Sequence, residues 1–154
     1  MNYWLMKSEP TTFGIEHLKK AKNQTYRWDG VRNYQARNMM RDDMAIGDRC
    51  FFYHSNCEVP GIVGIMEVVK KAYPDHTAFD PDSKYHDPKS NPDNPRWFMV
   101  DVKLIKTFEH IIPLKSLREN PKLSEMILLR KGNRLSITPV TKNQWDAILR
   151  MHET

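Results

Sequence analysis

Two neighbouring stretches of sequence decide the fold: RCFFYHSN at residues 49–56 and GIVGIMEVVKKAY at residues 61–73. Both are short and rich in apolar residues, and a brief link that contains proline and glycine separates them. Runs of this kind joined by a turn signal are typical of a hairpin. We therefore predict that the two stretches pair as antiparallel strands.

Further strands and helices surround this hairpin in an irregular order. We expect strands at 3–7 (YWLMK), 25–29, 96–108 (RWFMVDVKLIKTF) and 135–140 (LSITPV). We expect helices at 13–20 with Thr12 as cap, 34–42 with Asn33 as cap, 113–117, 121–130, and after Thr141, which forms a capping box with Gln144. This order favours a single α+β domain over residues 1–154, with a curled or closed mixed sheet and helices packed on it.

The composition indicates a soluble globular protein with an anionic partner. Of the 154 residues, 40% are hydrophobic and 28% are charged, and the net charge of +5 favours nucleic acid. The N-terminus lacks the features of a signal peptide, and the most apolar run, GIVGIMEVV, is short and carries Glu67. We therefore expect a cytoplasmic protein with no membrane partner. We also expect a monomer. Cys50 and Cys57 have no second pair for a zinc site and are expected to be reduced structural thiols.

The familiar enzymatic motifs are absent, although this does not exclude an unusual enzyme. His54 next to Ser55 suggests a base and a nucleophile, but adjacent strand residues point to opposite faces, so hydrogen bonding at a strand end is favoured. Segment 74–95 has no periodicity and reads as a long functional loop. We expect it to bind no metal and no cofactor, because its acidic and histidine residues lack the spacing of a metal site. These residues are His76, Asp80, Asp82, His86 and Asp87.

The stretch YRWDGVRNYQARN at 26–38 carries the clearest chemical signal. It mixes aromatic rings with arginines and amides, and this mixture suits a planar heterocycle, since rings stack on a base while amides and hydroxyls contact its edge. The alternative is that Trp28 is a core residue and that the arginines form a solvated rim. The residues alone leave both interpretations open.

Six ordered blocks resemble one family: WLMKSEP (4–10), WDGVRNYQARN (28–38), YHSN (53–56), PGIVGI (60–65), DPKS (87–90) and GNRLSITPV (132–140). They are similar to the EVE domain family, that of the thymocyte nuclear proteins, which belongs to the PUA-like superfamily and is similar to YTH domains. The resemblance implies a PUA-like β-barrel with flanking helices and a pocket for a modified base. The long charged tail of nuclear members is lacking, which favours the cytoplasm.

The resemblance also implies the site residues. Ligand-binding residues would come from the first strand end, from the aromatic stretch and from a neighbouring strand end: Lys7, Ser8, Glu9, Trp28, Val31, Arg32, Asn33, Tyr34, His54, Ser55 and Asn56. Phosphates would meet Arg37, Arg130, Lys131 and Arg134. Simpler alternatives remain open, with Lys7 and Arg134 as surface charges and Ser55 and Asn56 as turn caps. Trp97 and Trp145 are expected in the core.

Two functional classes follow. The favoured one is a non-catalytic domain that binds nucleic acid and recognises a modified base, such as a 5-substituted cytosine, flipped into an aromatic-lined pocket. The alternative is an enzyme that acts on such a base or nucleotide, with Glu9 as its acid or base. A lone carboxylate is thin support for catalysis, which needs an activated water or nucleophile. The sequence leaves open which modification is bound, and whether it lies in DNA or RNA.

Overall fold

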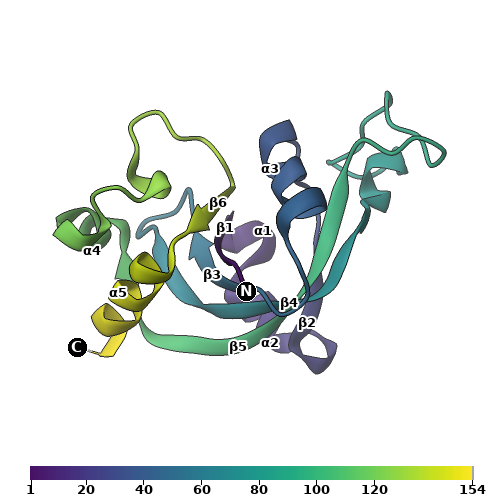
Figure 1. Ribbon diagram of the computed structural model, residues 1–154. Coiled ribbons are helices and arrows are strands. Elements are labelled where there is room, and N and C mark those ends of the chain that lie inside the picture. Colours follow the sequence, from purple (N-terminus) through teal and green to yellow (C-terminus); the bar gives the residue numbers. More distant parts are fainter. Residues whose placement is uncertain (154) are drawn as a thin grey trace.

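A computed structural model of the protein describes residues 1–153 and contains one six-stranded mixed sheet (Figure 1). The strand order is β2-β5-β4-β3-β1-β6. β1 and β3 run parallel, whereas the other neighbouring pairs are antiparallel. The strands are β1 (Tyr3–Ser8), β2 (Thr25–Trp28), β3 (Arg49–His54), β4 (Gly61–Pro74), β5 (Phe98–Pro113) and β6 (Ile137–Val140).

The predicted hairpin is confirmed as β3 and β4, in which Phe51 pairs with Ile65. Both faces of β3 are covered. Phe52 lies in a core cluster on one face, while Phe51 and Tyr53 lie in a second cluster on the other. A strand that is buried on both faces has no polar side to present, so its sequence is continuously apolar instead of alternating.

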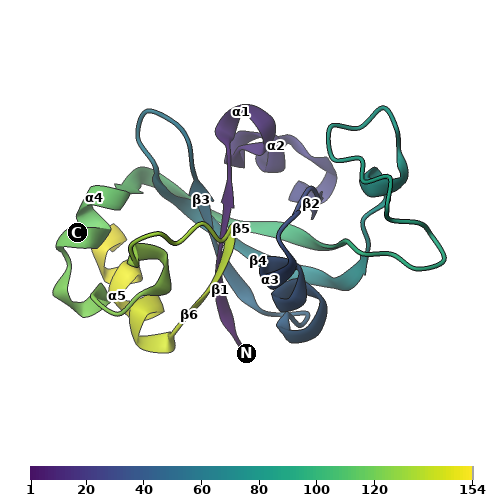
Figure 2. The same cartoon turned by 90° about the horizontal axis from the view of Figure 1, so that it is seen from above.

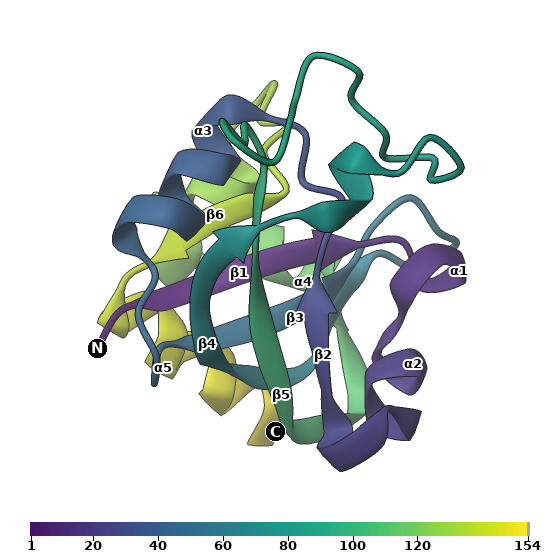
Figure 3. The same cartoon turned by 90° about the vertical axis from the view of Figure 1, so that its right-hand side faces the viewer.

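The sheet is strongly curved but open. β4 and β5 are 14 and 16 residues long, and their pairing shifts register at four places. Such bulges bend a strand and increase its twist, and Figure 3 shows both strands curving across the molecule. β2 and β6 form the two edges, and within residues 1–153 no pairing joins them. The predicted barrel is therefore a curled sheet.

Helices cover both faces of the sheet (Figures 1 and 2). The helices are α1 (Pro10–Phe13), α2 (Ile15–Lys20), α3 (Tyr34–Asn38), α4 (Leu114–Glu119) and α5 (Lys142–Glu153). α3 continues into a π turn at Met39–Asp43, and 3₁₀ turns lie at Lys22–Gln24, His76–Phe79, Pro121–Leu123 and Ile127–Leu129. α2 and α3 pack on the first core cluster, and α4 and α5 on the second. No helix within the described part of the chain is long and apolar enough to span a membrane.

Two predicted helices are wrong in detail. The helix expected at 13–20 is interrupted at Gly14, whose backbone is extended, and Thr12 lies inside α1 instead of capping. Proline fits the first turn of a helix, so Pro10 starts α1 early. The helix expected at 121–130 is two 3₁₀ turns. Its buried side chains are spaced by three and then two residues, which one helical face cannot accommodate: Leu123, Met126 and Leu128.

The two predicted caps with the clearest signals are confirmed. The Asn33 side chain accepts the Ala36 N–H at 3.0 Å at the start of α3. At α5, the Thr141 hydroxyl accepts the Gln144 N–H at 3.1 Å, and Gln144 in turn accepts the Thr141 N–H at 3.0 Å. This reciprocal pair satisfies two backbone donors that the first turn leaves free.

Replacing Thr141 with alanine should remove this cap and lower the free energy of unfolding by about 1 kcal/mol. Urea denaturation followed by circular dichroism measures the change. Thr11→Ala is the matched control, because Thr11 is exposed within α1 and caps no helix. Equal stability of the two variants would contradict the assigned role of the capping box.

Candidate nucleic-acid interface

A cavity of about 480 Å³ opens where β1 and β3 end. Because these two strands are parallel, their carboxyl ends lie side by side, with Ser8 opposite His54. The Ser55 N–H donates to the Ser8 carbonyl at 3.0 Å and extends this pairing by one residue. The parallel pair therefore brings Lys7, Ser8, Glu9 and Ser55 to one end of the sheet.

Most of the predicted ligand residues line this cavity. They come from the end of β1, from the segment between β2 and α3, and from the end of β3: Lys7, Ser8, Glu9, Trp28, Val31, Arg32, Asn33 and Ser55. Arg134, expected at the phosphates, lines it too. Sequence reasoning missed Thr12, Asp29, Gly30, Lys84, Tyr85 and Ser136.

Trp28 serves both interpretations that the sequence left open. Only 4% of it is exposed, and its ring packs edge-on against Phe13 and Phe52 at centroid distances of 5.8 and 5.2 Å. It is thus a core tryptophan that also lines the cavity. Only a small part of its surface remains for a bound base.

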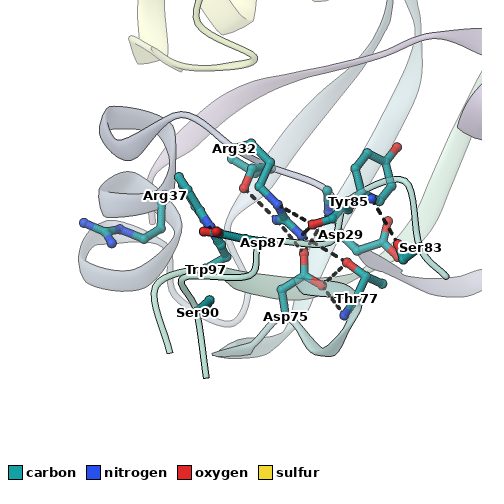
Figure 4. Close-up of polar contacts among 12 residues, drawn as sticks. Asp29, Arg32, Arg37, Asp75, Thr77, Ser83, Tyr85, Asp87, Ser90 and Trp97 are labelled. Atoms are coloured by element: carbon teal, nitrogen blue, oxygen red, sulfur yellow. Dashed lines mark hydrogen bonds and ion pairs between the residues drawn. The ribbon is translucent and has the colours of Figure 1, made fainter. Parts of the chain in front are cut away.

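A buried carboxylate fixes the segment that follows β2. Asp75 is fully buried and accepts the Gly30 N–H at 2.9 Å, the Thr77 N–H at 2.9 Å and Arg32 Nη1 at 3.1 Å (Figure 4). Burial alone would raise the pKa of Asp75. The hydrogen bonds from Thr77 and Gly30, together with the charge of Arg32, outweigh burial, and the pKa lies below its ordinary value.

Arg32 lines the cavity and is also bound to the protein itself. An arginine has five N–H donors, and here all five donate within the protein. Nε and Nη2 donate to the Tyr85 carbonyl at 3.0 and 2.7 Å, and Nη2 also donates to the Thr77 hydroxyl at 3.2 Å. Nη1 donates to the Val31 carbonyl at 3.0 Å and to Asp75. Arg32 therefore clamps the 74–95 loop and has no N–H left for a ligand.

This clamp makes the loop a wall of the cavity. Gly30 has φ +79°, and a Cβ there would lie 2.5 Å from the Tyr85 ring, so glycine is required both by conformation and by space. Beside Tyr85, the Lys84 ammonium lies 3.4 Å from the Thr12 hydroxyl. The 74–95 loop thus supplies one side of the cavity.

Tyr34 and Arg37 lie outside the cavity. The Tyr34 ring stacks on Trp97, which is buried as predicted, at a centroid distance of 4.7 Å. The Arg37 guanidinium lies 4.8 Å from the Tyr34 ring and donates to the Arg96 carbonyl at 2.8 Å. Both residues hold α3 against the end of the loop instead of facing the cavity.

His54 and Asn56 also lie outside it. His54 Nε2 accepts the Ile15 N–H at 3.1 Å at the start of α2, and burial lowers the pKa of His54. Asn56 is exposed, and its amide donates to the Glu9 carboxylate at 3.1 Å. It acts on the site by positioning Glu9.

Cations dominate the mouth of the cavity. Lys7 is half-buried, and burial lowers the pKa of its ammonium. Within the described residues it has no carboxylate at ion-pair distance. Lys84 and Arg134 are exposed nearby. Of the two acids, Asp29 pairs with Arg27 at 3.0 Å, which leaves Glu9 as the one whose charge is not neutralised by an ion pair in residues 1–153.

Two loop carboxylates that the sequence analysis considered and did not favour as metal ligands accept hydrogen bonds within the protein. Asp87 accepts the Trp97 indole N–H at 2.7 Å, and Asp80 accepts the Asp82 N–H at 2.9 Å. In the part of the chain that the structure describes, no group of three or more potential metal ligands gathers. Cys50 and Cys57 are free thiols.

Comparison with known proteins gives a consistent result. Residues 2–151 match the EVE domain family. The chain is 46% identical to mouse thymocyte nuclear protein 1 over 170 residues, which cover 99% of this chain and 74% of the relative. It is 44% identical to human THYN1 protein, whose crystal structure in complex with 5-methylcytosine containing DNA superposes with a TM-score of 0.94, covering 100% of this chain and 99% of that one.

A more distant likeness concerns the fold alone. The YTH domain of a Zygosaccharomyces rouxii protein, solved in complex with N6-methyladenosine RNA, is 12% identical and superposes with a TM-score of 0.56, covering 99% of this chain and 86% of that one. The predicted resemblances to EVE and YTH domains are therefore confirmed. The matched family and relatives indicate no enzymatic family.

Replacing Asp75 with alanine should leave Arg32 partly buried without its counter-charge and lower the free energy of unfolding by about 3 kcal/mol. Because the pKa of Asp75 is depressed in the folded state, its contribution is present above about pH 4 and is lost on further acidification. Urea denaturation at pH 7 and at lower pH tests both statements. Asp93→Ala, on the exposed loop, should change little; equal loss in both variants would contradict the clamp.

The depressed pKa of His54 predicts a second pH effect. Neutral His54 accepts a backbone N–H, and the unfolded chain binds the proton more readily, so stability should fall as the pH drops below about 6.5. His54→Gln should reduce this fall, whereas His110→Gln, at an exposed site, should keep it. Thermal unfolding between pH 8 and pH 5 measures the effect, and identical profiles for all three proteins would disprove it.

Proposed function

Because the chain belongs to the EVE domain family, we propose that it is a non-catalytic nucleic-acid-binding domain whose cavity receives a modified base, in particular a 5-substituted cytosine. The single observation that carries this proposal is the human relative, which is 44% identical along the whole chain and was solved with DNA that contains 5-methylcytosine. The cavity at the ends of β1 and β3 is the part of the surface that suits such a ligand.

The size and lining of the cavity support a base as its occupant. Its volume of about 480 Å³ lies in the range of ordinary small-ligand pockets, about 300–1,000 Å³. The Tyr85 ring and the small exposed part of Trp28 offer aromatic surface, while Ser8 and Ser55 offer hydroxyls. A paired base reaches such a cavity only after extrusion from the duplex.

Glu9 supplies the acceptor that a cytosine requires. The exocyclic amine of cytosine is a donor, and a carboxylate is its usual protein partner. Glu9 lines the cavity and is held by the amide of Asn56. Hydroxyls both donate and accept, so Ser8 and Ser55 can complement the remaining edge of the base.

The same geometry favours binding over catalysis. An enzyme that acts on a base needs an activated water or nucleophile beside the reacting carbon. Glu9 is exposed and its hydrogen bond is to an amide, the second acid of the cavity, Asp29, is paired with Arg27, and within the described residues no group of three or more potential metal ligands gathers. The contacts that remain are those of recognition.

Affinity should come from several modest terms. Extruding a base costs a few kcal/mol, and stacking returns about 1–3 kcal/mol. A buried methyl group adds roughly 0.8 kcal/mol. Phosphate contacts by Arg130, Lys131 and Arg134, which are all exposed, supply the remainder. We therefore expect about micromolar, salt-sensitive binding with several-fold to hundredfold preference for the modified base.

Fluorescence anisotropy with matched oligonucleotides tests the proposal. One set carries a single 5-methylcytosine and the other carries cytosine at the same position, as single strands and as duplexes. Preference for the modified set supports the function, and equal affinity overturns it. Mass analysis of the nucleosides after incubation, with and without divalent metal, should find them unchanged; their conversion would favour the enzyme.

Glu9→Gln should weaken binding of the modified oligonucleotide by about 1–3 kcal/mol, since an acceptor that faces the base amine is replaced by a group that also donates. The effect on an oligonucleotide without the target cytosine should be small. Glu109→Gln, on the exposed surface of β5, changes the charge equally and should leave the preference intact. A matching loss in both variants would show that only net charge matters.

A further inference from the structure

A second hollow, of about 540 Å³, adjoins the base cavity. Lys7 lines both, so its side chain lies at the boundary between them. The other walls come from Tyr53 of β3, from α4, and from the segment between α4 and β6. Figure 2 shows this segment running from the α4 and α5 side of the molecule to β6 beside β1, and the Lys7 N–H donates to the Ser136 carbonyl at 2.8 Å.

The charge of this second hollow is of one sign. Its lining holds Lys7, Arg118, Arg130 and Lys131 and no carboxylate. None of these four cations forms an ion pair in the part of the chain that the structure describes. Four cations in one depression repel one another, and a bound anion would remove that repulsion.

Two donors in the hollow lack an acceptor. The side-chain amide nitrogen of Asn133 is buried and has no hydrogen-bond partner in residues 1–153, although its oxygen accepts the Leu135 N–H at 3.2 Å. Asn133 lines the hollow. The Lys7 ammonium is half-buried and likewise has no carboxylate partner there. Buried donors without acceptors are rare and point to a ligand that accepts.

The arginines on the α3 side of the base cavity are already engaged. Arg32 donates all its N–H groups inside the protein, Arg37 donates to the Arg96 carbonyl and to Asn38, and Arg41 pairs with Asp42. Next to Lys7, by contrast, Arg118, Arg130 and Lys131 have donors to spare: among the described residues, the one side-chain hydrogen bond of these three runs from Arg118 Nη1 to the Leu129 carbonyl at 3.4 Å.

We propose that the second hollow binds the phosphodiester next to the recognised base, with Lys7, Arg118, Lys131 and the Asn133 amide as its donors. This inference rests on the proposed function and adds the direction in which the nucleic-acid backbone runs. The nucleic-acid backbone leaves the base cavity past Lys7 towards α4, and does not pass over α3. Arg37, expected at the backbone from the sequence, has no part in it.

The test uses oligonucleotides with one neutral methylphosphonate linkage, placed either before or after the 5-methylcytosine. For the wild-type protein, one of the two placements should weaken binding by about tenfold, as expected for the loss of one charged hydrogen-bonded contact. Arg118→Ala and Lys131→Ala should weaken binding of the unmodified linkage similarly and lower the salt dependence by about one phosphate contact. With either variant, the sensitive placement should then have little further effect.

Lys106→Ala is the matched control, because it removes one exposed cation from β5, away from both cavities. If it lowers affinity and salt dependence as much as Lys131→Ala, the phosphate site is overturned. A change in the ratio between 5-methylcytosine and cytosine binding would also overturn it, since a phosphate contact carries no information about the base.

Failure of the proposed function gives a different result. In that case the wild-type protein would not distinguish 5-methylcytosine from cytosine, although loss of salt dependence in Arg118→Ala would still support the phosphate site. Inorganic phosphate serves as the competitor that separates a free anion from a phosphodiester. If low millimolar phosphate abolishes the effect of the neutral linkage, the hollow is a site for free anions, and the proposed path of the backbone is wrong.

Discussion

The shape of the base cavity depends on the guanidinium group of Arg32. The chain between β4 and β5 leaves the sheet for more than twenty residues and contributes no strand to it. Its base is closed by the hydrogen bond between the Asp75 N–H and the Trp97 carbonyl, but its far end is fixed by Arg32. Because Arg32 is itself held by Asp75, a charge pair between a partly buried guanidinium and a buried carboxylate fixes the position of the loop.

The two sides of the cavity are built by different means. On one side, backbone pairing between the parallel strands β1 and β3 sets the positions of Ser8 and Ser55. On the other side, the Arg32 side chain donates to the Tyr85 carbonyl and holds Tyr85 against Gly30. The first arrangement is as rigid as the sheet, whereas the second rests on a few polar contacts whose strength depends on their exclusion from water.

Local sequence patterns predict most strands of the sheet, whereas the expected cavity residues come from the resemblance to EVE domains. Apolar runs predict β3 and β4, and the capping residues Asn33 and Thr141 predict where α3 and α5 begin. Pairing between distant strands is not written in such patterns, nor is the choice of an open sheet over a closed barrel. The register shifts between β4 and β5, which curve the sheet, have no signature in composition.

Four of the residues predicted to bind ligand or phosphate share one feature in the structure. Arg32, Tyr34, Arg37 and His54 look like binding groups because they are polar or aromatic and lie near the right segment, yet each finds its partner inside the protein. A side chain is available to a ligand only when the fold leaves its donors or its ring faces free. That property depends on the 74–95 loop and on α2, whose positions are set by contacts across the chain.

The contacts that fix the position of the 74–95 loop are largely independent of the side chain that the loop presents to the cavity. Arg32 donates its hydrogen bonds to the backbone carbonyl of Tyr85, a group that every amino acid carries, although its guanidinium also lies 5.6 Å from the centroid of the Tyr85 ring. The residue at this position could therefore be exchanged for another while the loop keeps its anchor. Substitution of the residue at position 85, in evolution or by design, can therefore change the ligand specificity of the cavity while the position of the loop is kept.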